Sequence, residues 1–219
     1  MKKNSKVWIF PLLLSLVLII SISCKKDTIP IETSIVTDID GNIYKTLKIG
    51  NQWWMAENLK TTKFHDGTPI PNVTDNDNWN RLYSSAYCWY QNDVANKNTK
   101  GGALYNGYAA MDSRNIAPTG WHVPTIDEWT TFKNYLSHES ISMSDLEKEG
   151  FSTMAVGFRS GLFDFNGIAL SWLSSTEKSE DYASKGSIFI QEFVLNKSSF
   201  TTGNYSDKTA GYSVRCIKD

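Results

Sequence analysis

A chain of 219 residues is long enough for one domain of ordinary size and too short for two full domains. Its formal net charge of -1 argues against a nucleic-acid partner, because proteins that bind nucleic acids present a basic face. The three cysteines include no Cys-x-x-Cys pair, so a thiolate zinc site is not expected.

The first 23 residues have the pattern of a secretory signal. Three lysines form a basic start, and an apolar run from Val7 to Ile22 follows. The segment Ser21-Ile22-Ser23-Cys24 resembles the bacterial lipobox, in which the cysteine is lipidated and becomes the new N-terminus. The apolar run is short for a membrane span of about 20 residues, which disfavours the alternatives of an uncleaved anchor or an ordinary signal peptide. We therefore expect residues 1–23 to be a lipoprotein signal peptide and Cys24 to carry acyl chains such as palmitate.

The lipid would hold the mature chain at the outer membrane, on its periplasmic side or on the cell surface. Residues 24–34 are short and polar and contain Pro30, so we expect a tether. Within it, Lys25-Lys26-Asp27 resembles the charged segment that directs some Bacteroidetes lipoproteins to the cell exterior, and Asp27-Thr28-Ile29 resembles the O-glycosylation sequon of that phylum. A plain solvated linker explains both segments equally well.

Residues 35–219 are predicted to form one domain that begins with a hairpin. The segment 38–42 has a turn composition, the segment 43–49 alternates apolar and polar residues, and Gly50-Asn51 turns the chain into 52–55. The spaced acids of the first turn resemble a calcium loop superficially. Its glycine comes too early and no bidentate glutamate closes a 12-residue loop, so calcium is not favoured there.

Two polar loops flank a dense aromatic strand predicted within 83–90. Acids and amides surround aromatic rings in these loops, a composition typical of sugar and calcium sites, since both ligands favour oxygen donors and sugars stack on rings. An ordinary surface loop, whose Asx side chains bond their own backbone, is the alternative. The candidate ligand-binding residues are Asp75, Asp77, Trp79, Trp89, Asn92 and Asp93.

The clearest helix signal covers about 125–138. Thr125 and Glu128 have capping-box spacing, and apolar residues recur at helical spacing up to Leu136. Before this helix, Pro118-Thr119-Gly120 predicts a turn. His122 has no second metal ligand or nucleophile motif near it, so a hydrogen-bonded structural histidine is the expectation.

The C-terminal half is predicted to be mainly strands. A short helix is expected at 144–149, strand-like segments at 155–163 and 171–177, a strand at 187–195 and a closing strand at 211–217. The closing strand is expected to pair near the N-terminal hairpin. Because neither Gly-x-Ser-x-Gly nor Ser-x-x-Lys occurs, a hydrolase nucleophile is not supported.

Several motifs together resemble the Fibrobacter succinogenes major paralogous domain family over about 35–219. The resemblance implies an α+β, C-type lectin-like fold with antiparallel strands and hairpins, one main helix and long loops. It also implies a secreted protein or lipoprotein with no established enzymatic activity. The motifs are Thr37-Asp38-Ile39-Asp40-Gly41-Asn42-Ile43-Tyr44, Ile49-Gly50-Asn51-Gln52-Trp53-Trp54-Met55-Ala56-Glu57-Asn58-Leu59, Tyr87-Cys88-Trp89-Tyr90, Pro118-Thr119-Gly120-Trp121-His122-Val123-Pro124, Ser174-Ser175-Thr176-Glu177 and Ser213-Val214-Arg215-Cys216.

The chain departs from this family pattern at Ala117, where many relatives place a cysteine. In its absence, Cys88 and Cys216 either pair with each other in the oxidising envelope or stay free and buried. Both possibilities remain open from the sequence.

From these features we expect a surface- or envelope-anchored lipoprotein with a non-catalytic binding or adhesion domain for a glycan or a protein. A structural or assembly subunit of an envelope or surface structure is the alternative. An enzyme on the lectin-like fold, as in formylglycine-generating enzymes, is less favoured, because that chemistry needs a reactive cysteine pair. We expect no catalytic residues, no metal site and no cofactor, with calcium the only ion considered, and a membrane partner through the lipid anchor.

Overall fold

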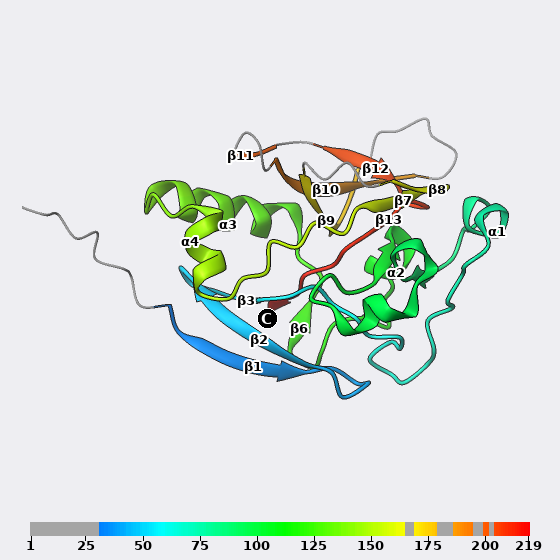
Figure 1. Cartoon of the computed structure of the whole chain (residues 1–219), viewed down its shortest axis with the longest axis horizontal. Coiled ribbons are helices and arrows are strands. Elements are labelled where there is room, and N and C mark those ends of the chain that lie inside the picture. The colour runs from blue at the N-terminus through cyan, green and yellow to red at the C-terminus, as the bar shows by residue number, and fades with distance from the viewer. Residues whose placement is uncertain (1–30, 165–168, 179–185, 195–198, 202–203) are drawn as a thin grey trace, which may run out of the picture. The chain divides into compact units, whose positions relative to one another are not determined.

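The computed structural model in Figure 1 describes residues 31–164, 169–178, 186–194, 199–201 and 204–219. These belong to one compact unit that begins at Ile31. Its first strand starts at Thr33, so the tether predicted for 24–34 overlaps the strand by two residues. The predicted signal peptide and Cys24 lie outside the described residues. Within the described ranges, no helix is both long and apolar enough to cross a membrane.

A five-stranded antiparallel sheet joins the two ends of the domain. Ile217 pairs with Trp54 on one side and with His122 on the other, so the predicted return of the closing strand to the N-terminal hairpin is confirmed. The predicted hairpin is part of a three-stranded meander, because residues before its first turn add one more strand. In spatial order the strands are β1 (Thr33–Thr37), β2 (Ile43–Ile49), β3 (Gln52–Met55), β14 (Ile217–Lys218) and β6 (Trp121–His122).

The main helix is α3 (Ile126–His138), and it begins where the sequence predicts. Thr125 is its N-cap, and both halves of the capping box with Glu128 are formed. In Figure 1, α3 and the shorter α4 (Met143–Lys148) lie between the first sheet and the strands drawn at the top. The rings of Trp54 and Trp129 approach to 4.5 Å, so α3 packs directly on β3.

A second sheet is built around the long strand β10 (Ser187–Val194). The strand β9 (Ala169–Lys178) pairs along one edge of β10, and two short strands pair along the other, β11 (Ser199–Phe200) and β12 (Tyr205–Asp207). Trp172 of β9 stacks on Trp129 of α3 at 5.3 Å, which joins this sheet to the main helix. The strand predicted at 187–195 is thereby confirmed apart from its last residue, which lies outside the described residues.

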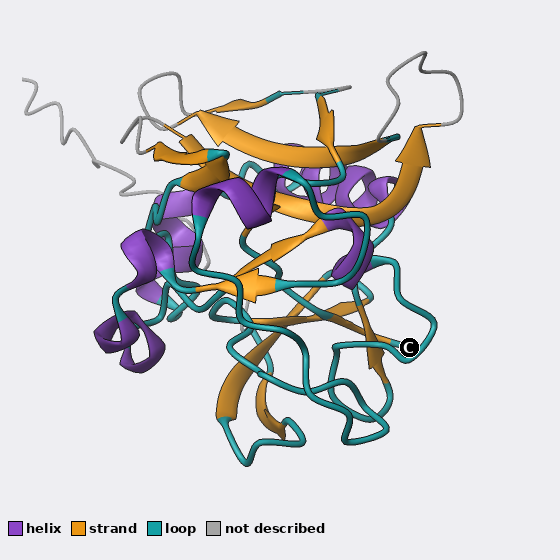
Figure 2. Ribbon diagram, turned by 90° about the vertical axis from the view of Figure 1, so that its right-hand side faces the viewer, coloured by secondary structure: helices purple, strands orange, loops and turns teal. Residues whose placement is uncertain are grey.

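The third sheet contains β4 (Tyr87–Cys88), β5 (Leu104–Asn106), β13 (Gly211–Tyr212), β7 (Phe158–Ser160) and β8 (Leu162–Asp164). The aromatic strand predicted within 83–90 is only two residues long, and the strand-like segment 155–163 forms a hairpin that turns at Gly161. Short helical segments connect these strands: α1 (Asn76–Asn80), η1 (Tyr90–Asn92), η2 (Val94–Asn98) and α2 (Gly107–Ala110). Figure 2 shows this mixture of sheets and short helices, and the predicted α+β class is confirmed.

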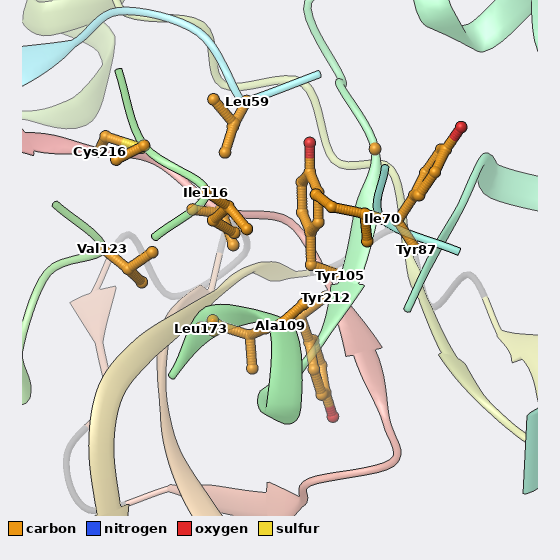
Figure 3. Close-up of a cluster of buried hydrophobic side chains, with 14 of the residues drawn as sticks. Leu59, Ile70, Tyr87, Tyr105, Ala109, Ile116, Val123, Leu173, Tyr212 and Cys216 are labelled. Atoms are coloured by element: carbon orange, nitrogen blue, oxygen red, sulfur yellow. The ribbon is translucent and has the colours of Figure 1, made fainter. Parts of the chain in front are cut away.

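Aromatic and aliphatic side chains share the interior. In the cluster of Figure 3, Tyr105 and Tyr212 lie beside Leu59, Val123 and other aliphatic side chains. The Tyr105 hydroxyl donates to the Thr61 carbonyl at 2.7 Å, so its polar end is satisfied inside the core. A second cluster of buried side chains surrounds the inward face of α3.

Candidate functional site

The structure brings the two predicted ligand loops together but uses their polar groups internally. Asn92 Nδ2 donates to the Thr74 carbonyl at 2.8 Å, which ties the second loop to the first. Asp75 accepts from the Asn78 amide as N-cap of α1, and Asp93 accepts from the Ala95 amide as N-cap of η2. The two carboxylates therefore act as helix caps. Asp77 is exposed in the first turn of α1.

The prediction that Trp79 and Trp89 bind a ligand is wrong. A ring that stacks on a sugar must present an exposed face, whereas Trp79 is 0% and Trp89 3% exposed. Trp89 packs in a separate cluster of the core, where its ring meets Tyr87. Trp79 lies 4.4 Å from the guanidinium of Arg159, a fully buried residue. The two terminal nitrogens of Arg159 donate to the Val73 and Thr74 carbonyls and hold the first loop against Trp79. The buried rings and the capping carboxylates of the two loops are structural, whereas the ligand role of Asp77 stays a prediction.

The turn that superficially resembles a calcium loop is closed by hydrogen bonds of its own. The Asp38 carboxylate accepts from the amides of Asp40 and Asn42, from the Asn42 side chain and from the Tyr44 hydroxyl, at 2.6–3.0 Å. Its oxygens are thus occupied by donors of the protein. Across the described residues, no group of three or more His, Cys, Asp or Glu side chains is placed to hold a metal ion.

His122 joins the end of the domain to the start of α3. Its Nδ1 lies 2.6 Å from Asp219 Oδ1, and its Nε2 lies 2.9 Å from Glu128 Oε1. Partial burial lowers the pKa of His122, but the hydrogen bonds and charges of Asp219 and Glu128 outweigh it and raise the pKa above its ordinary value. The imidazole therefore has the structural role that the sequence indicates.

Sequence reasoning missed a buried polar cluster of Asn58, Trp172 and Arg215. Asn58 Oδ1 accepts from the Trp172 indole at 2.9 Å and from Arg215 Nε and Nη2 at 3.1 and 2.7 Å. Arg215 is fully buried without a carboxylate among its hydrogen-bond partners, and burial lowers its pKa to about 9. Asn58 and Arg215 stand within the sequence motifs of the resemblance and Trp172 lies two residues before one of them, so the motifs were the available signal. The geometry indicates a structural role, in which the hydrogen bonds join three distant segments of the chain.

Cys88 and Cys216 are free, buried thiols in separate clusters of the core. Of the two possibilities left open by the sequence, the structure has the unbonded one. Burial raises the pKa of Cys88 to about 11, although a contact with Arg159 lowers it in part, and burial raises the pKa of Cys216 well above its ordinary value.

A solvent-open groove lies between the C-terminal half of α3, the start of α4 and strands β10 and β11. We call it the α3–β11 groove, and its volume is ≈ 280 Å³. Its apolar floor consists of Leu136, Ile141, Met143, Phe193 and Phe200, and its polar rim consists of Lys133, Ser137, Ser142 and Ser199. The apolar stripe predicted for the main helix includes part of this floor. Nothing in the sequence indicated that β11 would lie opposite that helix.

The floor of the groove is held rigidly by ring contacts. Phe200 meets Phe193 edge-on at 4.9 Å and Phe132 edge-on at 5.9 Å. At the rim, Lys133 makes no ion pair with any residue that the structure describes. A hollow lined by both apolar and polar atoms, with Lys133 at its edge, suits a ligand group that is apolar and carries a negative charge nearby.

In the part of the chain that the structure describes, the fold is a mixed α+β domain of three antiparallel sheets, braced by the capped helix α3 and hollowed at the α3–β11 groove. The family model of the Fibrobacter succinogenes major domain matches residues 47–218, and the chain belongs to this family. Neither a curated protein nor a solved structure matches the chain.

Proposed function

We propose that this protein is an outer-membrane lipoprotein whose domain binds another protein at the α3–β11 groove and performs no chemistry on it. The observation that carries the proposal is the groove itself, with its apolar floor, its charged rim and its volume of ≈ 280 Å³. Binding energy at protein interfaces concentrates where a large side chain fills such a pocket. A C-type lectin-like relationship of the fold is part of the same proposal, supported by the order of motifs from the main helix to the closing strand.

A protein ligand fits the groove better than a glycan. Sugar sites combine an exposed ring face with several convergent oxygen and amide groups. In the predicted sugar-binding loops the rings are buried, and in the groove the floor is apolar with hydroxyls only at the rim. The expected ligand is an exposed phenylalanine- or leucine-type side chain of a partner, with an acidic residue beside it for Lys133.

Anchoring at Cys24 would keep the domain near the membrane. Thr33 lies nine positions after Cys24, a length that reaches at most about 30 Å when fully extended. The partner is therefore expected in the envelope or on the cell surface. A binding role without catalysis is supported by the thiols, because Cys88 and Cys216 are buried apart from each other and do not form a reactive pair.

Photo-crosslinking from the groove of the full-length protein in intact cells tests this proposal. A photoreactive residue in place of Ser199 is expected to give one defined protein adduct, and one in place of the exposed Ser144, outside the groove lining, is not. Adding Ile141→Lys should abolish the adduct, because a partner that covers the floor would then bury an unpaired charge. The matched variant Ile39→Lys, on an exposed isoleucine elsewhere, should leave it unchanged.

Mass spectrometry identifies the adduct, and the purified partner is then titrated with the wild-type chain and both lysine variants. A glycan adduct in place of a protein adduct would contradict a protein ligand. Equal binding by the wild-type chain and the Ile141→Lys variant would rule out the groove.

An assembly subunit of a surface structure is the second candidate. One specific observation favours it: no strand that the structure describes pairs with the outer edge of β1.

A further inference from the structure

The strand β1 lies at the end of its sheet, and its outer edge is open. Among the described residues it pairs only with β2, in continuous register from Thr33 opposite Leu47 to Thr37 opposite Ile43. No described segment covers its other side. The question is what this edge can bind.

The backbone groups that face outward follow from the register. Glu32 and Asp38 exchange backbone hydrogen bonds with the opposite strand, through Lys48 N to Glu32 O at 2.9 Å and Asp38 N to Asn42 O at 3.0 Å. In an antiparallel pair, inward- and outward-facing residues alternate. Thr33, Ile35 and Thr37 therefore direct their N–H and C=O groups away from β2.

The strand also lacks the features that normally protect an edge. Natural edge strands carry a charge, a proline or a bulge that prevents further pairing. The segment Thr33–Thr37 is Thr-Ser-Ile-Val-Thr, with no charge, no proline and an unbroken register. Beside it the side chains of Ile35 and Ile43 are 68% and 60% exposed. Both side chains lie on the same face of the sheet, because Thr37 pairs with Ile43 and stands two residues from Ile35.

We propose that β1 pairs antiparallel with β1 of a second copy of this chain, about a two-fold axis at Ile35. This register places Ile35 opposite Ile35 and Thr33 opposite Thr37, and it is the one in which all three outward residues of each copy find partners. The two five-stranded sheets then form one continuous sheet. The two Ile35 side chains adjoin each other and the nearby Ile43 side chains, which removes apolar surface from water.

A second copy suits this edge better than an unrelated strand. The strand is uncharged, so pairing with itself carries no like-charge penalty within the segment. Just beyond it, Glu32 comes opposite Asp38 of the second copy, and each acid is already engaged, Glu32 by Lys48 at 2.7 Å and Asp38 by its own turn. Pairing of two five-residue strands buries less than a standard interface, so the dimer is expected to be weak in dilute solution.

Membrane anchoring strengthens such a weak pair. A short tether from Cys24 keeps the β1 strands of all copies close to one surface, which raises their effective concentration. This step alone rests on the proposed lipid anchor. The pairing geometry is independent of the anchor and of the groove.

Cysteine crosslinking of the full-length chain, reconstituted in phospholipid vesicles, tests the dimer. In the proposed register the Ile35 side chains of the two copies are about 5 Å apart at Cβ. A short bismaleimide should therefore convert Ile35→Cys into a covalent dimer. The Ile39→Cys variant is the matched control, since its two positions would lie roughly 25 Å apart. The wild-type chain supplies the blank for the native cysteines.

Adding Thr37→Pro to Ile35→Cys should weaken dimerisation roughly tenfold, because each copy loses one outward donor. Thr37 does not donate to β2, so the midpoint of thermal unfolding should stay unchanged and show that β1 is intact. Equal crosslinking at positions 35 and 39, or dimerisation that Thr37→Pro does not weaken, would overturn the proposal. Failure of the wild-type chain to associate with vesicles would instead count against the lipid anchor.

Discussion

Two buried arginines pack against large aromatic rings of the core. Arg215 lies 4.1 Å from the Phe151 ring and 5.1 Å from the Trp172 ring, and Arg159 is placed in the same way between Trp79 and Phe163. Both guanidinium groups donate to carbonyl oxygens of the backbone and of asparagine. Ring faces and neutral acceptors thus offset part of the cost of burying a charge. Sequence composition alone could not distinguish these rings from a ligand surface.

Asn58 is the acceptor on which the Arg215 cluster depends. We expect Asn58→Ala to lower the free energy of unfolding by about 3–5 kcal/mol, because it removes the acceptor of a buried indole and leaves a buried guanidinium with the Ser152 carbonyl in place of two acceptor groups. Urea unfolding of the purified protein measures the loss. Asn134→Ala, on the exposed side of α3, is the control and should change the free energy by less than about 0.5 kcal/mol. A similar loss in both variants would contradict the role of Asn58.

The histidine bridge makes stability depend on pH. Because the folded pKa of His122 is raised above the reference value of 6.5, its contribution to stability is complete below pH 6.5 and is lost as pH rises through the folded pKa. Urea unfolding from pH 6.5 upward should therefore show a decline in the free energy of unfolding. The decline should be smaller in His122→Gln, which can bond to Asp219 and Glu128 but does not titrate. An unchanged slope in that variant would assign the dependence to another group.

The two core cysteines give a prediction about reactivity. The thiolate is the reactive form, and burial disfavours it at Cys88 and Cys216. Neither thiol of the native protein should react with a chromogenic disulfide at neutral pH. In denaturant without reductant, both should react. A count of zero thiols from these positions in the denatured protein would show that they are bonded to each other.

At the scale of elements, local sequence patterns predicted those helices and strands that are determined by interactions between residues close in sequence. The capping box and the apolar stripe located α3 to within one residue, and alternation located β2 and β10. The strand predicted within 83–90 is only two residues long. The backbone carbonyls at the C-terminal end of this segment accept from residues that follow it and do not continue the pairing with a neighbouring strand. The strand β1 was assigned in part to the tether, since its pairing with β2 is not visible in its own five residues.

The contribution of the α3 N-cap to stability should be measurable by substituting Thr125. Thr125 Oγ1 accepts from the Glu128 amide at 3.2 Å, and Glu128 Oε2 accepts from the Thr125 amide at 2.8 Å. We expect Thr125→Ala to cost about 1 kcal/mol, because one amide of the first turn loses its acceptor. Thr125→Ser keeps the hydroxyl and should lose less than half of that. Equal losses, measured by thermal or urea unfolding, would point to the methyl group of the threonine.

At the scale of the whole molecule, the order of strands could not be read from the sequence. The hairpin pairing of β2 and β3 was predictable from a short turn, and the closing strand was expected nearby. The position of β14 between β3 and β6 depends on contacts across more than half of the chain, for which no local pattern codes. The candidate site was predicted less well than the strand order, for the same reason. The α3–β11 groove needs two distant segments to meet, whereas the predicted loops were chosen by local composition.

The central position of β14 predicts a severe effect of a small truncation. A chain ending at Arg215 lacks buried Cys216 and Ile217 and leaves β3 and β6 without their common partner. We expect it to lose most of a typical stability of about 5–15 kcal/mol and to show no cooperative unfolding transition by circular dichroism. Removal of Asp219 alone should cost much less, because only its bonds to His122 and Gly120 are lost. A cooperative transition in the longer truncation would contradict this placement.

The same arrangement has a consequence for the time order of folding. Residues 52–55 complete their pairing only with residues 217–218, so most of the domain must emerge from the ribosome before the first sheet can close. Until then, the early strands have no central partner, and the barrier includes closure of a very long loop. The position of one two-residue strand thus delays closure of the first sheet until nearly the whole domain has been synthesised.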